Sequence, residues 1–156
     1  MKTDALIHNS TLQVISDLDA VTTVVEWLEQ FNHTPVTYQL WLEAQTAVIE
    51  GFTNVVRHAH RYLNPQTPVD LNVRISHEYF EVAIWDQGDI FDFELALENF
   101  HQEVSDRAFN PLDHEAHWGC IFLLKLRQEY GWKISYTRES KDKNCLLMKK
   151  MLVLSH

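Results

Sequence analysis

The sequence has no long run of apolar residues, and no stretch approaches the roughly 20 residues that span a membrane. Residues 1–10 also lack the apolar core of a secretory signal peptide. Basic residues are few, since 13 lysines and arginines accompany 22 aspartates and glutamates and leave a net charge of −9. Nucleic acids and anionic membranes repel such a chain, so we expect neither as a partner. These features predict a cytoplasmic protein.

Cysteine is also scarce. Cys120 and Cys145 form no motif, and each is followed by apolar residues, which is typical of small core side chains and fits a reducing compartment. His114 and His117 are three residues apart, but zinc needs at least a third protein ligand, and the sequence indicates none. We therefore expect neither a disulfide nor a zinc site.

Apolar residues are plentiful, at 46% of the 156 residues, and aromatic residues add to a core at 12%. This composition predicts one ordered domain over 1–156. The patterns along the chain predict an α+β two-layer sandwich, with helices covering one face of a mixed, mostly antiparallel sheet. The expected order begins with a strand (5–15), a helix opened by Asp17 or Asp19, a long helix (37–63) and a hairpin (69–75 and 80–84). A long connection (90–117), a helix from Trp118 to Gly131 and a second hairpin follow, and this hairpin starts at Ile134, turns over 138–144 and ends in a strand over 145–154. We expect that Asn9 and Ser10 could interrupt the first strand and that Lys149 and Lys150 break the last one.

The long helix carries polar residues at intervals of four. Glu50, Asn54 and His58 lie about 40° apart per step and so follow one face, while apolar residues spaced by three or four form a stripe for burial. The polar face has two interpretations. It is a solvated surface, or its carboxylate and amide form an oxygen site for Mg²⁺ beside a nucleotide.

The connection over 90–117 is acidic, with Arg107 as its single basic residue. Its aromatic and aliphatic residues predict a short helix near its start, without one clear period. Connections of this length are usually functional or disordered, so we expect a partly mobile, lid-like segment.

Taken together, three motifs resemble the GHKL (histidine-kinase-like) ATPase superfamily. They are E-x-x-x-N-x-x-x-H-A at Glu50 to Ala59, D-x-G at Asp86 to Gly88, and Gly119 opening a helix after the long connection. The chain length and the form E-G-F-T-N-V-V-R-H-A resemble, within it, the bacterial anti-sigma factor serine/threonine kinases. The resemblance covers about 40–152 and implies the GHKL (Bergerat) fold with ATP and Mg²⁺ as cofactors.

The resemblance also implies roles for individual residues. Asn54 matches the asparagine that holds Mg²⁺ against the phosphates. Glu50 matches the catalytic carboxylate, which accepts a proton from the attacking hydroxyl. Asp86 matches the aspartate that binds the adenine amino group.

The remaining matches line the same nucleotide site. Gly88 matches a glycine that lets the backbone approach the base. Gly119 matches a glycine at a helix N-terminus, where backbone N–H groups favour phosphate. Arg57 and His58 are expected at the mouth of the site. A plain turn remains the alternative interpretation of Asp86 and Gly88.

Two departures from the family pattern affect the expected phosphate cover. The family's first glycine box reads D-x-G-x-G, and Ile90 stands at its second glycine. The second box reads G-x-G, and His117 stands at its first glycine. Side chains at these positions obstruct a backbone cradle for phosphate, and the acidic connection adds repulsion.

The resemblance implies an anti-sigma regulatory factor, a possible ATP-dependent serine/threonine protein kinase. It would phosphorylate a serine of an anti-sigma antagonist protein, would sequester a sigma factor, and would form a homodimer through its first strand and helix. The alternative is a non-catalytic regulatory binding module that keeps the fold but has lost nucleotide binding. A detached ATPase domain of a two-component histidine kinase is a weaker alternative, because the chain leaves no room for a phosphoacceptor helix pair.

Overall fold

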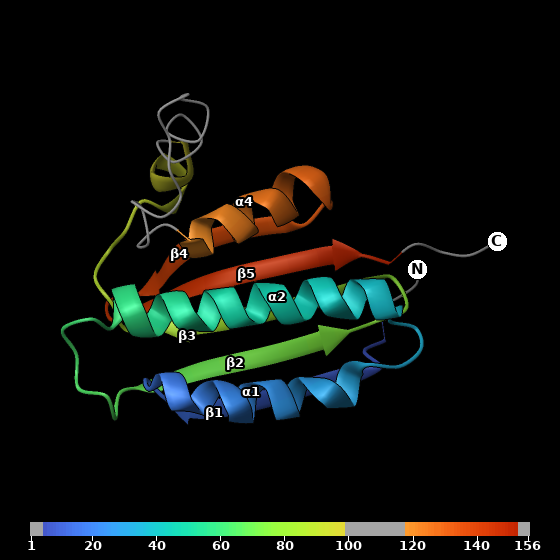
Figure 1. Ribbon diagram of the computed structural model, residues 1–156, viewed down its shortest axis with the longest axis horizontal. Coiled ribbons are helices and arrows are strands. Elements are labelled where there is room, and N and C mark those ends of the chain that lie inside the picture. The colour runs from blue at the N-terminus through green and yellow to red at the C-terminus, as the bar shows by residue number, and fades with distance from the viewer. Residues whose placement is uncertain (1–4, 99–117, 153–156) are drawn as a thin grey trace.

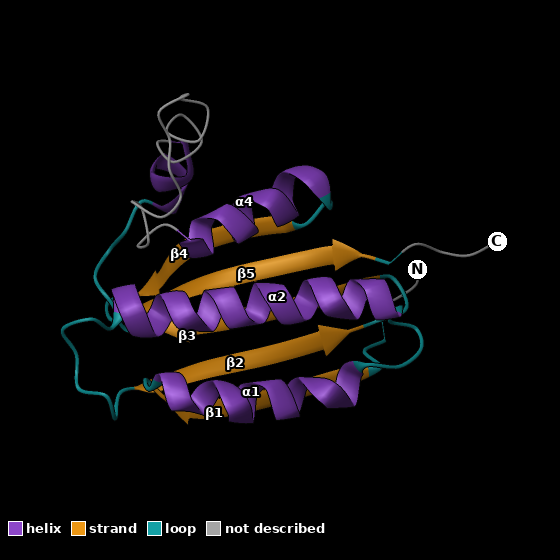
Figure 2. Cartoon of the chain, viewed as in Figure 1, coloured by secondary structure: helices purple, strands orange, loops and turns teal. Residues whose placement is uncertain are grey.

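The computed structural model describes residues 5–98 and 118–152, which form a two-layer α+β structure (Figure 1). The sheet has the order β1-β2-β3-β5-β4, and each neighbouring pair is antiparallel. Figure 2 shows that the labelled helices cover one face of it. The predicted α+β sandwich is therefore confirmed, with a purely antiparallel sheet in the described part. The strands are β1 (His8–Ile15), β2 (Pro68–Ile75), β3 (Tyr79–Asp86), β4 (Lys133–Ser140) and β5 (Lys143–Met151), and the helices are η1 (Leu18–Ala20), α1 (Val21–Leu28), η2 (Glu29–Phe31), α2 (Tyr38–Asn54), the π-helix η3 (Val55–Ala59) and α4 (Trp118–Glu129).

The core lies between the helices and the sheet. In β2 and β3 every second side chain is fully buried, as the predicted alternation requires. Helix α2 lies over the middle of the sheet (Figure 1) and buries the predicted apolar stripe. The shared members of this core are Val69, Leu71, Val73, Ile75, Phe80, Val82 and Ile84 from the sheet, with Trp41, Ala44, Val48, Phe52 and Val55 from α2 and η3.

Side-chain caps set the helix starts. The Asp17 carboxylate accepts from the Asp19 N–H at 2.9 Å and opens η1, and the Thr37 hydroxyl accepts from the Leu40 N–H at 3.1 Å and opens α2. The predicted long helix ends earlier than residue 63. After Asn54 it widens into η3, where the His60 N–H reaches the Val55 carbonyl at 2.7 Å, a π-type bond, and the helix stops at Ala59.

Two predicted strand interruptions are wrong. The Asn9 and Ser10 side chains lie within an unbroken β1, because each finds a partner: Asn72 Nδ2 donates to Asn9 Oδ1 at 2.9 Å, and Trp27 Nε1 donates to Ser10 Oγ at 3.0 Å. Lys149 and Lys150 likewise lie within an unbroken β5.

The predicted turn over 138–144 is also too long. Arg138 and Asn144 pair across β4 and β5, and only 141–142 turn between the two strands. Arg138 and Lys143 lie in the paired strands, so their charge does not indicate a loop. The short helix predicted early in the long connection is present over 93–98, and residues 99–117 lie outside the described part of the chain.

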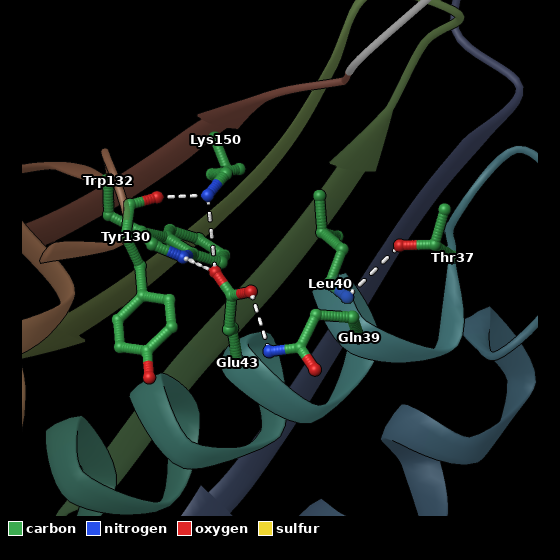
Figure 3. Close-up of polar contacts among 7 residues, drawn as sticks. All are labelled: Thr37, Gln39, Leu40, Glu43, Tyr130, Trp132 and Lys150. Atoms are coloured by element: carbon green, nitrogen blue, oxygen red, sulfur yellow. Dashed lines mark hydrogen bonds and ion pairs between the residues drawn. The ribbon is translucent and has the colours of Figure 1, made fainter. Parts of the chain in front are cut away.

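A buried carboxylate ties α2 to the second hairpin (Figure 3). Glu43 is 8% exposed, and its Oε1 accepts from Trp132 Nε1 at 2.9 Å and from Lys150 Nζ at 3.2 Å. Its Oε2 accepts from Gln39 Nε2 at 3.1 Å.

Gly131, at φ 74°, ends α4 and leads into Trp132. Within the described residues, no helix has the length and hydrophobicity needed to cross a bilayer.

Candidate functional site

The two main motifs meet where α2 and η3 end beside the end of β3. The Gln87 N–H donates to His60 Nε2 at 2.8 Å, across 27 residues of sequence. Gly88 lies against the last turn of η3, so closely that an added Cβ would lie 2.6 Å from the Ala59 carbonyl oxygen. The D-x-G loop is therefore fastened directly to the end of the helix that carries Glu50 and Asn54.

Asp86 sits at the centre of this junction and is only 2% exposed. Its Oδ1 accepts from the Gly88 N–H and from Asn144 Nδ2, both at 2.8 Å. Its Oδ2 accepts from the Tyr136 hydroxyl at 2.6 Å, a length typical of a charge-assisted bond. Three donors thus satisfy a carboxylate that would otherwise be costly to bury.

The strand register brings these donors together. Asp86 pairs with Asn144 across β3 and β5, and Asn144 pairs with Arg138 across β5 and β4, so the three form one row on the sheet. Arg138 Nη1 donates to the Gly88 carbonyl at 2.8 Å and to Asn144 Oδ1 at 3.1 Å. Asn144 Nδ2 also donates to the Gly88 carbonyl, at 3.0 Å. The second hairpin therefore holds the D-x-G loop from the side opposite η3.

Tyr136 reaches this row from two residues before Arg138, on the same side of β4. Its ring packs near Phe91 and Phe93, with centroid distances of 6.2 Å and 6.0 Å. Burial and the hydrogen bond to Asp86 raise the pKa of Tyr136 well above its usual value, so the hydroxyl keeps its proton.

Glu50 and Asn54 lie on the last two turns of α2, and both are half-buried. Within the described part of the chain, neither side chain has a hydrogen-bond partner, unlike Glu43, which lies on the same side of the helix seven residues before Glu50. Glu43 is buried against Trp132, whereas the exposure along this side of α2 and η3 increases from Glu50 and Asn54, which are partly exposed, to His58, which is exposed. Burial raises the pKa of Glu50, while the nearby charge of Arg57 opposes the shift.

The other predicted site residues lie around this junction. Arg57 and His58 are exposed on η3, and Gly119 is in the first turn of α4. Ile90, at the position of the missing glycine, is 79% exposed. His117, at the other missing glycine, and the pair His114 and His117 lie outside the described residues.

Sequence reasoning missed four residues of the junction, which are His60, Tyr136, Arg138 and Asn144. His60 is 3% exposed, and burial lowers its pKa despite the nearby charge of Asp86. Its Nε2 accepts a bond, so Nδ1 carries the proton, and that buried atom has no partner within the described structure. The period-two spacing of Ile134, Tyr136 and Arg138 was the one available signal, because it places the polar pair on the same face as a core residue.

A hollow of the described surface adjoins the loop side of this junction. It measures about 280 Å³ and is lined by Asp86 and Gln87 of the junction together with Asp70, Trp85 and Lys143, at the ends of β2, β3 and β5. Lys143 bridges it, 3.9 Å from the Asp70 carboxylate and 5.5 Å from the Trp85 ring centroid. Neither Glu50 nor Asn54 lines it, so the hollow adjoins the loop side of the junction and not its helix side.

Comparison with known proteins agrees with this geometry. The family model described as histidine kinase-like ATPase domain matches residues 14–150. Curated relatives include the serine-protein kinase RsbW of Staphylococcus aureus strains bovine RF122 / ET3-1, MRSA252 and JH9, each 33% identical over 99 residues, which is 64% of this chain. The match spans only 62% of the length of these relatives. The fold, the joined motifs and the family match lead to one conclusion: the chain belongs to the histidine kinase-like ATPase domain family.

Proposed function

We propose that this chain is a regulatory serine-protein kinase that uses Mg²⁺-ATP. One observation carries the proposal: the D-x-G loop is fastened to the end of the helix that bears Glu50 and Asn54, by the 2.8 Å bond from Gln87 to His60 and the packing of Gly88 on Ala59. A turn former and a solvated helix face would have no reason to be joined in this way. The whole of 1–156 would form the one nucleotide-binding domain.

The helix side of the junction fits the metal and phosphates. Asn54 would hold Mg²⁺ through its amide oxygen, since oxygen ligands suit this cation. Glu50 would accept the proton of the attacking serine hydroxyl, and its raised pKa makes its carboxylate a stronger base. Backbone N–H groups at the start of α4, at Gly119, would favour phosphate. When bound, Mg²⁺-ATP supplies the phosphoryl group and neutralises its charge.

The loop side of the junction would take the adenine. Asp86 offers a carboxylate held in one orientation by Gly88 and Asn144, and the close packing of Gly88 leaves no room for a side chain there. Arg57 and His58, exposed on η3, would lie at the mouth. Such fixed acceptors favour one base orientation, because little rotation remains to be lost on binding.

The proposed partners are proteins. By likeness to relatives named serine-protein kinase, the phosphorylated residue would be a serine. The resemblance of the motifs to anti-sigma factor kinases suggests an anti-sigma antagonist protein as the substrate and a sigma factor as the second partner. The net charge of −9 argues for basic protein surfaces rather than nucleic acid or membrane. We further propose a cytoplasmic homodimer that pairs through β1 and α1.

Two substitutions separate binding from chemistry. Asn54→Ala is expected to abolish Mg²⁺-dependent ATP binding, measured by isothermal titration. Glu50→Gln is expected to retain that binding and to lose phosphoryl transfer to serine, measured with radiolabelled ATP. Gln45→Ala is the matched control, because it removes an amide nine residues earlier, on the opposite side of α2. Unchanged ATP affinity in Asn54→Ala would refute the metal assignment.

A second candidate function rests on the same aspartate. Asp86 is 2% exposed and already accepts from three protein donors, which suits a non-catalytic binding module whose base site has become part of the core. Such a module would bind its protein partner equally well with Asn54→Ala and without nucleotide. Partner binding that requires ATP would eliminate this candidate.

A further inference from the structure

The donors on Asp86 differ in how they are held. The Gly88 N–H belongs to the backbone of the same loop, and the Asn144 amide sits directly opposite Asp86 in the β3–β5 register, held in turn by Arg138. The Gly88 N–H cannot leave without moving the loop, and the Asn144 amide cannot leave without losing its bonds to Arg138 and to the Gly88 carbonyl. The Tyr136 hydroxyl alone occupies Oδ2 among the described contacts, at 2.6 Å, from the end of a side chain that reaches across from edge strand β4.

We propose that Tyr136 occupies the acceptor on Asp86 that the amino group of adenine would use, so that the two donors compete and Tyr136 sets the affinity of the site for adenine. This inference rests on the proposed nucleotide-binding function. It adds a specificity-determining residue in β4, outside every motif that the sequence displays.

The chemistry of the two donors makes them alternatives. An ionised carboxylate can only accept hydrogen bonds. The Tyr136 phenol and the amino group of adenine are both donors, so either of them can bind it. With Oδ1 already accepting two bonds, Oδ2 is the oxygen left for either donor. Because Asp86 is 2% exposed and the Tyr136 hydroxyl lies 2.6 Å from Oδ2, the base cannot reach Oδ2 while the phenol stays in place.

The Tyr136 ring is partly buried, beside Phe93, which is 7% exposed, and Phe91, which is 54% exposed. Its neighbours Phe91 and Phe93 follow the D-x-G loop, and Phe91 is largely exposed. The backbone of β4 pairs with β5 alone, so a rotation of the Tyr136 side chain breaks no strand pairing. Adenine would enter by displacing the phenol sideways against these rings, at the loss of one charge-assisted hydrogen bond.

The test compares Tyr136→Phe with wild type by isothermal titration. The ligands are ADP with Mg²⁺ and a 6-deamino analogue of ADP, whose purine carries hydrogen in place of the amino group. Tyr136→Phe removes the competing donor and keeps the ring, so ADP affinity is expected to rise about tenfold while affinity for the analogue stays unchanged. Tyr79→Phe is the matched control, since Tyr79 lies at the far end of β3 with Lys149 above its ring.

The outcomes separate this inference from the proposed function. If Tyr136→Phe binds ADP no more tightly than wild type does, the proposed competition between Tyr136 and adenine is overturned. ADP binding by Tyr136→Phe but not by wild type supports the competition and overturns nucleotide binding by the natural chain. Absence of ADP binding in both proteins overturns both proposals. Thermal unfolding checks that Tyr136→Phe is folded, and Tyr136→Leu, which also lacks the hydroxyl, must reproduce the gain in ADP affinity.

Discussion

The junction of the two motifs depends on a close backbone contact, which Gly88→Ala tests directly. A Cβ at Gly88 would lie 2.6 Å from the Ala59 carbonyl oxygen and 3.0 Å from the Ala59 Cβ. Neither atom is the end of a flexible side chain, so the D-x-G loop or the end of η3 must shift. Overpacking of this kind costs about 1–3 kcal/mol. Replacing glycine by alanine also reduces the conformational entropy of the unfolded chain, which stabilises the folded protein by about 0.4–1 kcal/mol.

We therefore expect Gly88→Ala to lower the free energy of unfolding by about 1–2 kcal/mol, measured by equilibrium urea denaturation. The shift also moves the loop away from His60, whose Nε2 accepts from Gln87. Binding of adenine nucleotide at Asp86 should weaken in parallel, because the loop that positions the carboxylate has moved.

Gly51→Ala is the matched control for this prediction. A Cβ at Gly51 would meet Ile84 Cδ1 at 2.8 Å and Leu146 Cδ2 at 3.0 Å, which are the ends of side chains that can rotate. Alanine also gains about 1 kcal/mol over glycine inside a helix. The net effect of Gly51→Ala should be close to zero. If Gly88→Ala proves as stable as Gly51→Ala, the inferred backbone contact between the loop and η3 is wrong.

Three further predictions concern buried polar groups. Glu43→Ala leaves the Trp132 N–H without its acceptor and Lys150 without its partner, so the free energy of unfolding, measured by thermal denaturation, should fall by about 2–4 kcal/mol. A fall of less than about 0.5 kcal/mol would contradict the buried network around Glu43. Burial lowers the pKa of His60 below its usual 6.5, so its contribution to stability is present above pH 6.5 and is lost as the pH falls through the folded-state pKa. In urea titrations from pH 7.5 to 5, the stability advantage of wild type over His60→Asn should therefore shrink. A constant difference would refute the lowered pKa of His60. Burial raises the pKa of Glu50 above 4.5, so its contribution to stability is present below pH 4.5 and is lost as the pH rises through the raised pKa. Wild type should therefore lose stability relative to Glu50→Gln over that rise in pH. The opposite trend would show that Glu50 has a stabilising partner.

Much of the fold follows from local patterns in the sequence. The alternation in β2 and β3 and the apolar stripe of α2 identified their elements and buried faces correctly, because burial of one face sets the period of each. Element ends were harder to predict. Asn9 and Ser10 look like strand breakers until Asn72 and Trp27 provide partners from β2 and α1, which no local pattern reveals.

The candidate site divides in the same way. Asp86, Gly88 and Asn54 belong to motifs and could be found from the sequence. Tyr136 and Asn144 could not, because their importance comes from a strand register that joins residues about 50 positions apart. The spacing of Tyr136 from Ile134 places it on the core-facing side of β4, but no local pattern shows that it will face a buried carboxylate.

The central claim is that the junction of η3 and the D-x-G loop binds an adenine nucleotide with Mg²⁺. The most direct measurement is isothermal titration of the purified protein with ADP, with and without Mg²⁺. We expect micromolar binding that depends on Mg²⁺ and is lost in Asn54→Ala. No binding up to millimolar ADP, or equal binding by Asn54→Ala, would contradict it.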